Sequence, residues 1–211
     1  MNLSRATTIT ALAAGALLLA GCSSPASSPD TTGYGTTAPT SAADAPAAAP
    51  GSTPSVPEFA SADGRLDVTL TATESQVPYS GTTRWAMTYN GAATGPTLRV
   101  HPGDTVTVNL VNHLSKPTSL HTHGLHVSPD QDNPFTMVGP GQTLTYTYNI
   151  PTDQQAGTYW YHPHVHELTA EQVASGLSGA IVVQDETDAR LATVSTDRVL
   201  VVNDPPLVQE N

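Results

Sequence analysis

The stretch TVTVNLV at residues 105–111 alternates polar and apolar side chains from Thr105 to Leu110. Strict alternation of this kind predicts a β-strand that buries one of its two faces. The turn residues PGD at 102–104 precede it, and before them lies a second predicted strand, TLRVH at residues 97–101. This arrangement of two short strands around a tight turn indicates the fold class, because similar strands and turns precede and follow it in the sequence.

Short strands and Gly/Pro turns continue through most of the chain. Asn90-Gly91 and the run GPG at 139–141 contain the residues that tight turns need. Residues 168–174 form a short helical candidate, and further strands are predicted at 66–70, 84–89, 120–127, 142–150, 157–162, 177–184 and 198–202. Many short strands at regular spacing predict an all-β sandwich that forms one domain.

The N-terminus has the features of a signal peptide. One positive charge in the first five residues precedes the apolar run ALAAGALLLA at 11–20, which is too short for a transmembrane helix. The run leads into LAGC at 19–22, which resembles the bacterial lipoprotein box, where the chain is cut before a cysteine that becomes lipidated. An ordinary secretory signal is the alternative. The resemblance implies a signal peptide at 1–21 and an extracytoplasmic protein that Cys22 anchors to the cell membrane.

Residues 22–56 differ in composition from the rest of the chain. They are rich in Ser, Thr, Ala, Pro and Gly and nearly lack bulky apolar side chains. Such a segment cannot bury enough surface to offset its ordering entropy, so we expect a disordered tether.

The chain is acidic, with a formal net charge of −11 from 7 Lys and Arg and 18 Asp and Glu. Binding of nucleic acid requires a basic face, so the charge argues against nucleic acid as a partner. The same charge attracts cations.

Two His-x-His pairs lie in stretches that are predicted to be strands: His121 with His123, and His162 with His164. Side chains two apart on a strand point to the same face, so each pair presents two imidazoles side by side. Two such strands facing each other would bring four imidazoles together, and imidazole suits copper, zinc, iron and nickel. Cys22 is the single cysteine, which excludes an internal disulfide and a multi-cysteine metal site.

Several motifs between residues 58 and 204 together resemble the first cupredoxin domain of laccase-like multicopper oxidases. Asn90-Gly91, GPTLRV at 95–100 and GDTV at 103–106 are similar to the opening strands of that family. HTHG at 121–124 resembles its first copper motif and YWYHPH at 159–164 its second, and EQV at 171–173 with GLSGA at 176–180 also fits. The resemblance implies a Greek-key β-sandwich of the cupredoxin type at residues 57–204, followed at 205–211 by the truncated start of a second domain.

The resemblance also assigns roles to individual residues. His121 would be a ligand of a type 2 copper, and His123, His162 and His164 would be ligands of a type 3 copper pair. These residues would form half of a trinuclear cluster that reduces O2 to water while a phenol, a diamine or a metal ion is oxidised. Asp132 resembles a family carboxylate that helps to supply protons to such a cluster. The alternative for Asp132 is a structural role in its turn.

We expect the other histidines to lie outside the ligand set and the aromatic residues to have structural roles. His166 has same-face spacing to the second pair, but the resemblance places it outside the ligand set. His101 and His113 adjoin turns, and we expect them to face solvent. Trp85, Trp160 and the tyrosines are expected to be core aromatics rather than electron relays.

The resemblance covers only half of such an oxidase. The other half of the family pattern carries the remaining cluster histidines and a type 1 copper site with a His-Cys-His core, and no cysteine follows Cys22. Three interpretations stay open: a fragment of an oxidase that works with a second cupredoxin domain, a surface lipoprotein that binds copper or confers copper tolerance without turnover, and a subunit that completes its cluster with another chain.

Overall fold

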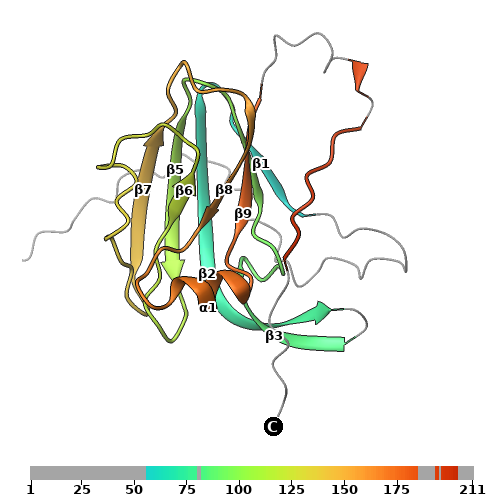
Figure 1. Cartoon of the computed structure of the whole chain (residues 1–211), viewed down its shortest axis with the longest axis vertical. Helices are drawn as coiled ribbons and strands as arrows, with labels where there is room; N and C mark the ends of the chain where they lie inside the picture. Colours follow the sequence, from blue (N-terminus) through green and yellow to red (C-terminus); the bar gives the residue numbers. More distant parts are fainter. Residues whose placement is uncertain (1–55, 80–81, 185–192, 195, 204–211) are drawn as a thin grey trace, which may run out of the picture. The chain divides into compact units, whose positions relative to one another are not determined.

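A computed structural model describes residues 56–79, 82–184, 193–194 and 196–203 (Figure 1). The described residues form mainly strands, with one short helix, α1 (Thr169–Ala174). The strands are β1 (Glu58–Ala60), β2 (Arg65–Tyr79), β3 (Thr82–Tyr89), β4 (Thr97–Val100), β5 (Thr105–Asn112), β6 (His121–His123), β7 (Thr143–Asn149), β8 (Gly157–His162) and β9 (Gly179–Val183). The predicted signal peptide at 1–21, nearly all of the tether at 22–56 and the segment at 205–211 lie outside the described residues.

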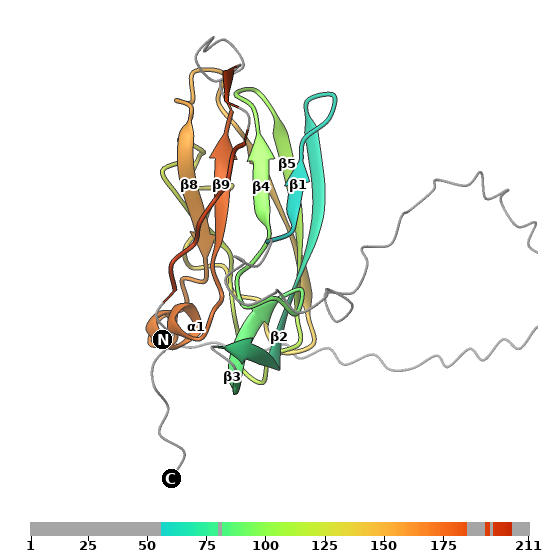
Figure 2. The same ribbon diagram turned by 90° about the vertical axis from the view of Figure 1, so that its right-hand side faces the viewer.

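The strands form two sheets, one with the order β1-β4-β9-β8-β6 and one with the order β3-β2-β5-β7. From β4 to β8, each strand belongs to the opposite sheet from the strand before it, so the chain crosses repeatedly between the two layers. Figure 2 shows β8, β9, β4 and β1 side by side in the larger sheet. This arrangement confirms the predicted Greek-key β-sandwich.

The core lies between the two sheets and follows the alternation in the sequence. On β5, Val106, Val108 and Leu110 are at most 4% exposed, while the residues between them are half-buried. They belong to one hydrophobic cluster with residues from the larger sheet and with four buried tyrosines, as expected: Tyr89, Tyr146, Tyr148 and Tyr161. Full burial of each aliphatic side chain contributes about 1.5–3 kcal/mol, so this cluster is the main source of stability.

The predicted turns are confirmed by the backbone. Asn90 and Gly91 have φ values of 56° and 77°, and the Ala92 N–H donates to the Tyr89 carbonyl at 3.3 Å. Asn and Gly tolerate this left-handed conformation better than other residues. Among the described residues, no helix has the length and apolar character needed to cross a membrane.

The structure corrects three expectations. β6 ends at His123 and not near residue 127, because Gly124 adopts a φ of 90° and turns the chain away. Residues 198–202 form no strand, since no described strand pairs with them. Trp85 is 48% exposed and is not a core residue. It lies on β3, which pairs with β2 in a ribbon that projects beyond the two sheets (Figure 1).

Candidate metal centre

The two histidine motifs meet through the pairing of β6 with β8. The strands are antiparallel neighbours, with His121 opposite His162 and His123 opposite Trp160. The prediction from the sequence required only that the two strands bring their histidines together, and here they do so as neighbours in a single sheet.

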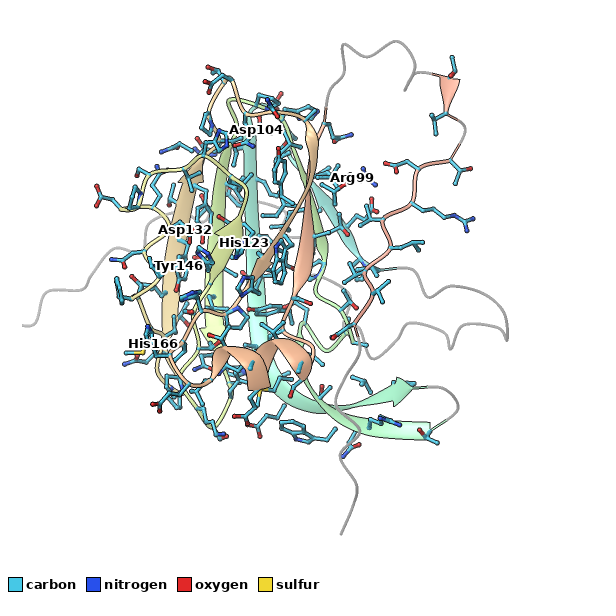
Figure 3. The ribbon with its side chains drawn as sticks, in the orientation of Figure 1. Arg99, Asp104, His123, Asp132, Tyr146 and His166 are labelled. Carbon is cyan, nitrogen blue, oxygen red and sulfur yellow. The ribbon has the colours of Figure 1, made fainter. Side chains whose placement is uncertain are left out.

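The imidazoles occupy the outer face of that sheet. Thr122, between His121 and His123, and Tyr161, directly before His162, are 6% and 1% exposed and line the interior between the sheets. Because successive side chains alternate between faces, His123 and His162 point away from that interior. His123 is exposed and is labelled in Figure 3. The candidate site is therefore separate from the hydrophobic core.

Three imidazoles converge closely enough to share a metal ion. One ring nitrogen from each of His121, His123 and His162 lies within 4.8 Å of those of the other two. The centroid of the His121 ring is 5.1 Å from that of His123 and 5.5 Å from that of His162, and His123 and His162 are 5.1 Å apart. Among the described residues, this is the group that can hold a metal ion.

His164 reaches the same place by a different path. β8 ends at His162, and Pro163 has no N–H with which to continue the ladder. The second pair therefore does not lie wholly on a strand, contrary to expectation. The His164 main-chain N–H donates instead to the Ser119 hydroxyl at 2.8 Å, and the His164 ring lies 5.1 Å from that of His121. The structure thus brings all four predicted histidines together.

Asp132 fixes the orientation of His121. Nδ1 of His121 lies 3.0 Å from Oδ1 of Asp132, and the main-chain N–H and hydroxyl of Thr122 donate to Oδ2 at 3.1 and 2.7 Å. A carboxylate only accepts hydrogen bonds, so the proton of His121 lies on Nδ1. The lone pair of Nε2 is left available to a metal, in the arrangement by which carboxylates orient histidine ligands.

His162 has the same tautomer for a different reason. Its Nδ1–H donates to the Pro163 carbonyl at 2.7 Å, and its Nε2 is buried without a hydrogen-bond partner among the described residues. Burial lowers the pKa of His162, and the neighbouring imidazoles lower it further. Nδ1 of His164 is also buried without such a partner. Buried imidazole nitrogens without a hydrogen-bond partner fit a metal ion that binds nitrogen ligands.

The remaining histidines lie outside this group. His113 is exposed, as predicted, and His166 is exposed and stacks on Phe135 with ring centroids 6.4 Å apart. His101 departs from expectation, because its side chain is only 31% exposed and its Nδ1 lies 3.2 Å from the Ser61 hydroxyl. Trp160 also departs from expectation: its indole is 40% exposed beside the histidines and is not part of the core.

Sequence reasoning missed the residues that hold the turn after β6. Gln154 is 3% exposed, accepts a hydrogen bond from the His126 N–H at 2.8 Å and donates to the Gly124 carbonyl at 3.2 Å. A Cβ atom on Gly124 would lie 2.4 Å from the Tyr159 ring. The glycine of HTHG could have indicated this turn from the sequence. Gln154 could not, because it lies 30 residues from Gly124 and belongs to no recognisable motif.

A family model described as multicopper oxidase matches residues 71–188, more than half of the 211-residue chain. The chain belongs to the multicopper oxidase family. It is 37% identical to multicopper oxidase mco of Staphylococcus aureus over 126 residues, which are 59% of this chain and 28% of that protein. It is 34% identical to copper resistance protein A of Escherichia coli over 154 residues, which are 71% of this chain and 24% of that protein.

The solved structures agree with this assignment. A multicopper oxidase from Campylobacter jejuni, described as a metallo-oxidase, superimposes with a TM-score of 0.60 at 34% identity. The match covers 66% of this chain and 31% of that one. The matched part of this chain therefore covers about a third or less of the length of these relatives. Copper is the metal of the family, and the histidine group fits it.

Proposed function

We propose that this chain is a cupredoxin domain that contributes half of the histidine ligands of a trinuclear type 2/type 3 copper cluster. The observation that carries the proposal is the convergence of His121, His123 and His162, with one ring nitrogen of each within 4.8 Å of the others. His164 adjoins the group, 5.1 Å from His121 between ring centroids. His121 would hold the type 2 copper, and the other three histidines would hold the type 3 pair.

The remaining ligands would come from a second cupredoxin domain or from another chain. The position of the imidazoles on the outer face of a sheet supports this, because a partner could cover that face without opening the core. His123 is already exposed there. Copper, when bound, would supply the redox chemistry that reduces O2 to water while a phenol, a diamine or a metal ion is oxidised.

Asp132 would have two roles that share one geometry. Its contact with Nδ1 of His121 keeps Nε2 of that ring available as a ligand atom. Its side chain is 9% exposed and contacts the candidate ligand His121 directly. This position supports a role in proton supply to the cluster.

Copper binding by the full chain tests the proposal. A His123→Ala/His164→Ala variant should lose high-affinity Cu(II) binding in a competition titration. The matched control is His113→Ala/His166→Ala, which removes two exposed imidazoles outside the group. The control should bind like the wild type, and equal losses from the two variants would refute the site.

A second candidate function is binding of copper at the cell surface without turnover. The similarity to copper resistance protein A of Escherichia coli favours it. Oxygen uptake by the copper-loaded chain, with a phenol or diamine as reductant, tests whether this chain assembles a complete cluster. Bound copper without uptake would favour the binding function or a domain that needs its other half. Uptake that depends on His123 and His164 would favour a cluster completed between chains.

We also propose that the protein is extracytoplasmic and attached to the cell membrane through a lipid on Cys22. The support is the sequence LAGC at 19–22 after an apolar run. An anchored domain would meet copper outside the cytoplasm.

A further inference from the structure

The candidate site includes an aromatic residue to which the family resemblance assigned no role. Trp160 lies directly opposite His123 in the β6–β8 ladder and two residues before His162 on the same strand. Its ring centroid is 4.1 Å from that of His162 and 5.2 Å from that of His123. The planes are inclined by only 27° and 28°, so the indole stacks against both imidazoles.

This stack involves His162, whose ring is already oriented to bind a metal cation through Nε2. Nε2 of His162 is buried and unpartnered, while its Nδ1–H is already bonded to the Pro163 carbonyl. When Nε2 donates its lone pair to a metal cation, the imidazole becomes electron-poor. The face of an indole is electron-rich and attracts cations and electron-poor rings. The stack should therefore be stronger in the metal-bound form than in the metal-free form.

We propose that Trp160 is a positioning residue of the copper site that stabilises the copper-bound forms of His162 and His123 through its π face. This inference rests on the proposed function and deepens it. The indole would hold the His162 ring in the plane that suits binding through Nε2. Its 40% exposure leaves the outer side of the ring open, so the same contact can persist when a partner approaches.

The chain provides a matched control, because Trp85 is its only other tryptophan. Trp85 is 48% exposed, similar to Trp160, but it pairs with Gln76 on the β2–β3 ribbon. No ring contact of Trp85 occurs among the described residues. Its replacement changes the same residue type at similar exposure without touching the histidines.

The affinity of the full chain for Cu(II) tests the proposal. We expect Trp160→Leu, which keeps apolar bulk, to weaken binding about tenfold, as expected for loss of a partly desolvated cation–π contact. Trp160→Phe should stay within about threefold of the wild type because it keeps a π face. Trp85→Leu should have no effect. Wild-type affinity in Trp160→Leu, or equal losses in Trp160→Leu and Trp160→Phe, would overturn the proposal.

A spectroscopic measurement tests the same contact without removing Trp160. In Trp85→Phe the remaining tryptophan emission comes from Trp160, and Cu(II) at one equivalent should quench most of it. In Trp160→Phe the emission comes from Trp85 and should persist. Equal quenching in the two variants would overturn the proposal even if Trp160→Leu failed to fold. Failure of the wild type to bind Cu(II) would instead overturn the proposed function, and this inference with it.

Discussion

Replacement of Asp132 by Asn changes the candidate site with almost no change in volume. The carboxylate accepts three hydrogen bonds: Oδ1 from the His121 ring, and Oδ2 from the main-chain N–H and the hydroxyl of Thr122. An amide has one oxygen, so its NH2 group must take the place of the other. If the amide oxygen faces His121, the NH2 faces the Thr122 N–H, and the reverse placement sets the NH2 against Nδ1–H of His121.

The size of the effect follows from this mismatch. Either placement leaves a donor facing a donor at a side chain that is 9% exposed, and the negative charge that favours the Nδ1–H tautomer of His121 is lost. Loss of a residue that orients a metal-binding histidine costs about 10- to 100-fold in metal affinity. That range corresponds to about 1.4–2.8 kcal/mol. We expect the affinity of Asp132→Asn for Cu(II) to fall within it.

The assay is a Cu(II) competition titration of the full chain at constant ionic strength. Asp130→Asn is the matched control, because it removes the same charge from an exposed position two residues away in the same loop. A general attraction of copper by the net charge of −11 would weaken both variants equally. Equal affinities of Asp132→Asn and Asp130→Asn would refute the orienting role of Asp132.

Three further predictions concern the fold and its attachment. Gly124→Ala should lower the free energy of unfolding by about 2 kcal/mol or more, because φ is 90° and the Cβ would approach the Tyr159 ring to 2.4 Å; an unchanged urea midpoint would contradict this. Burial raises the pKa of Tyr148 and Tyr161. Because these phenols ionise near pH 10 when unfolded, stability should fall as pH rises above about 10, by up to about 1.4 kcal/mol per pH unit for each tyrosine; urea midpoints that stay constant from pH 8 to 11 would argue against it. Cys22→Ser should abolish incorporation of labelled palmitate and release the protein from membranes, and continued labelling would exclude Cys22 as the anchor.

The fold was predictable wherever burial follows a local pattern. The alternation at residues 105–111 predicts β5 because each apolar residue there faces the core. The strand predicted at 120–127 was too long, because Gly124 adopts a φ of 90° and its carbonyl is held by Gln154, 30 residues away in the sequence. The strand predicted at 198–202 failed because a strand needs a neighbour to pair with, which no local pattern supplies.

The histidines of the candidate site were predictable from the sequence, whereas the residues that hold the backbone around them were not. The motifs identified the four histidines, and the structure brings them together. Ser119 holds the backbone of His164, and Gln154 holds the turn at Gly124 and His126, from positions that carry no motif. The position of Trp160 on the histidine face could have been inferred, since it shares the parity of His162 on β8, whereas Tyr161, which packs in the core, has the opposite parity.

That alternation along β8 separates two kinds of evolutionary constraint. Substitutions at Tyr161 act on folding, because its ring is 1% exposed and its hydroxyl donates to the Pro96 carbonyl at 2.7 Å. Substitutions at Trp160 and His162 act on the outer face and leave the packing between the sheets in place. The candidate site and the sandwich can therefore change independently along this strand, because alternate residues of β8 serve one or the other.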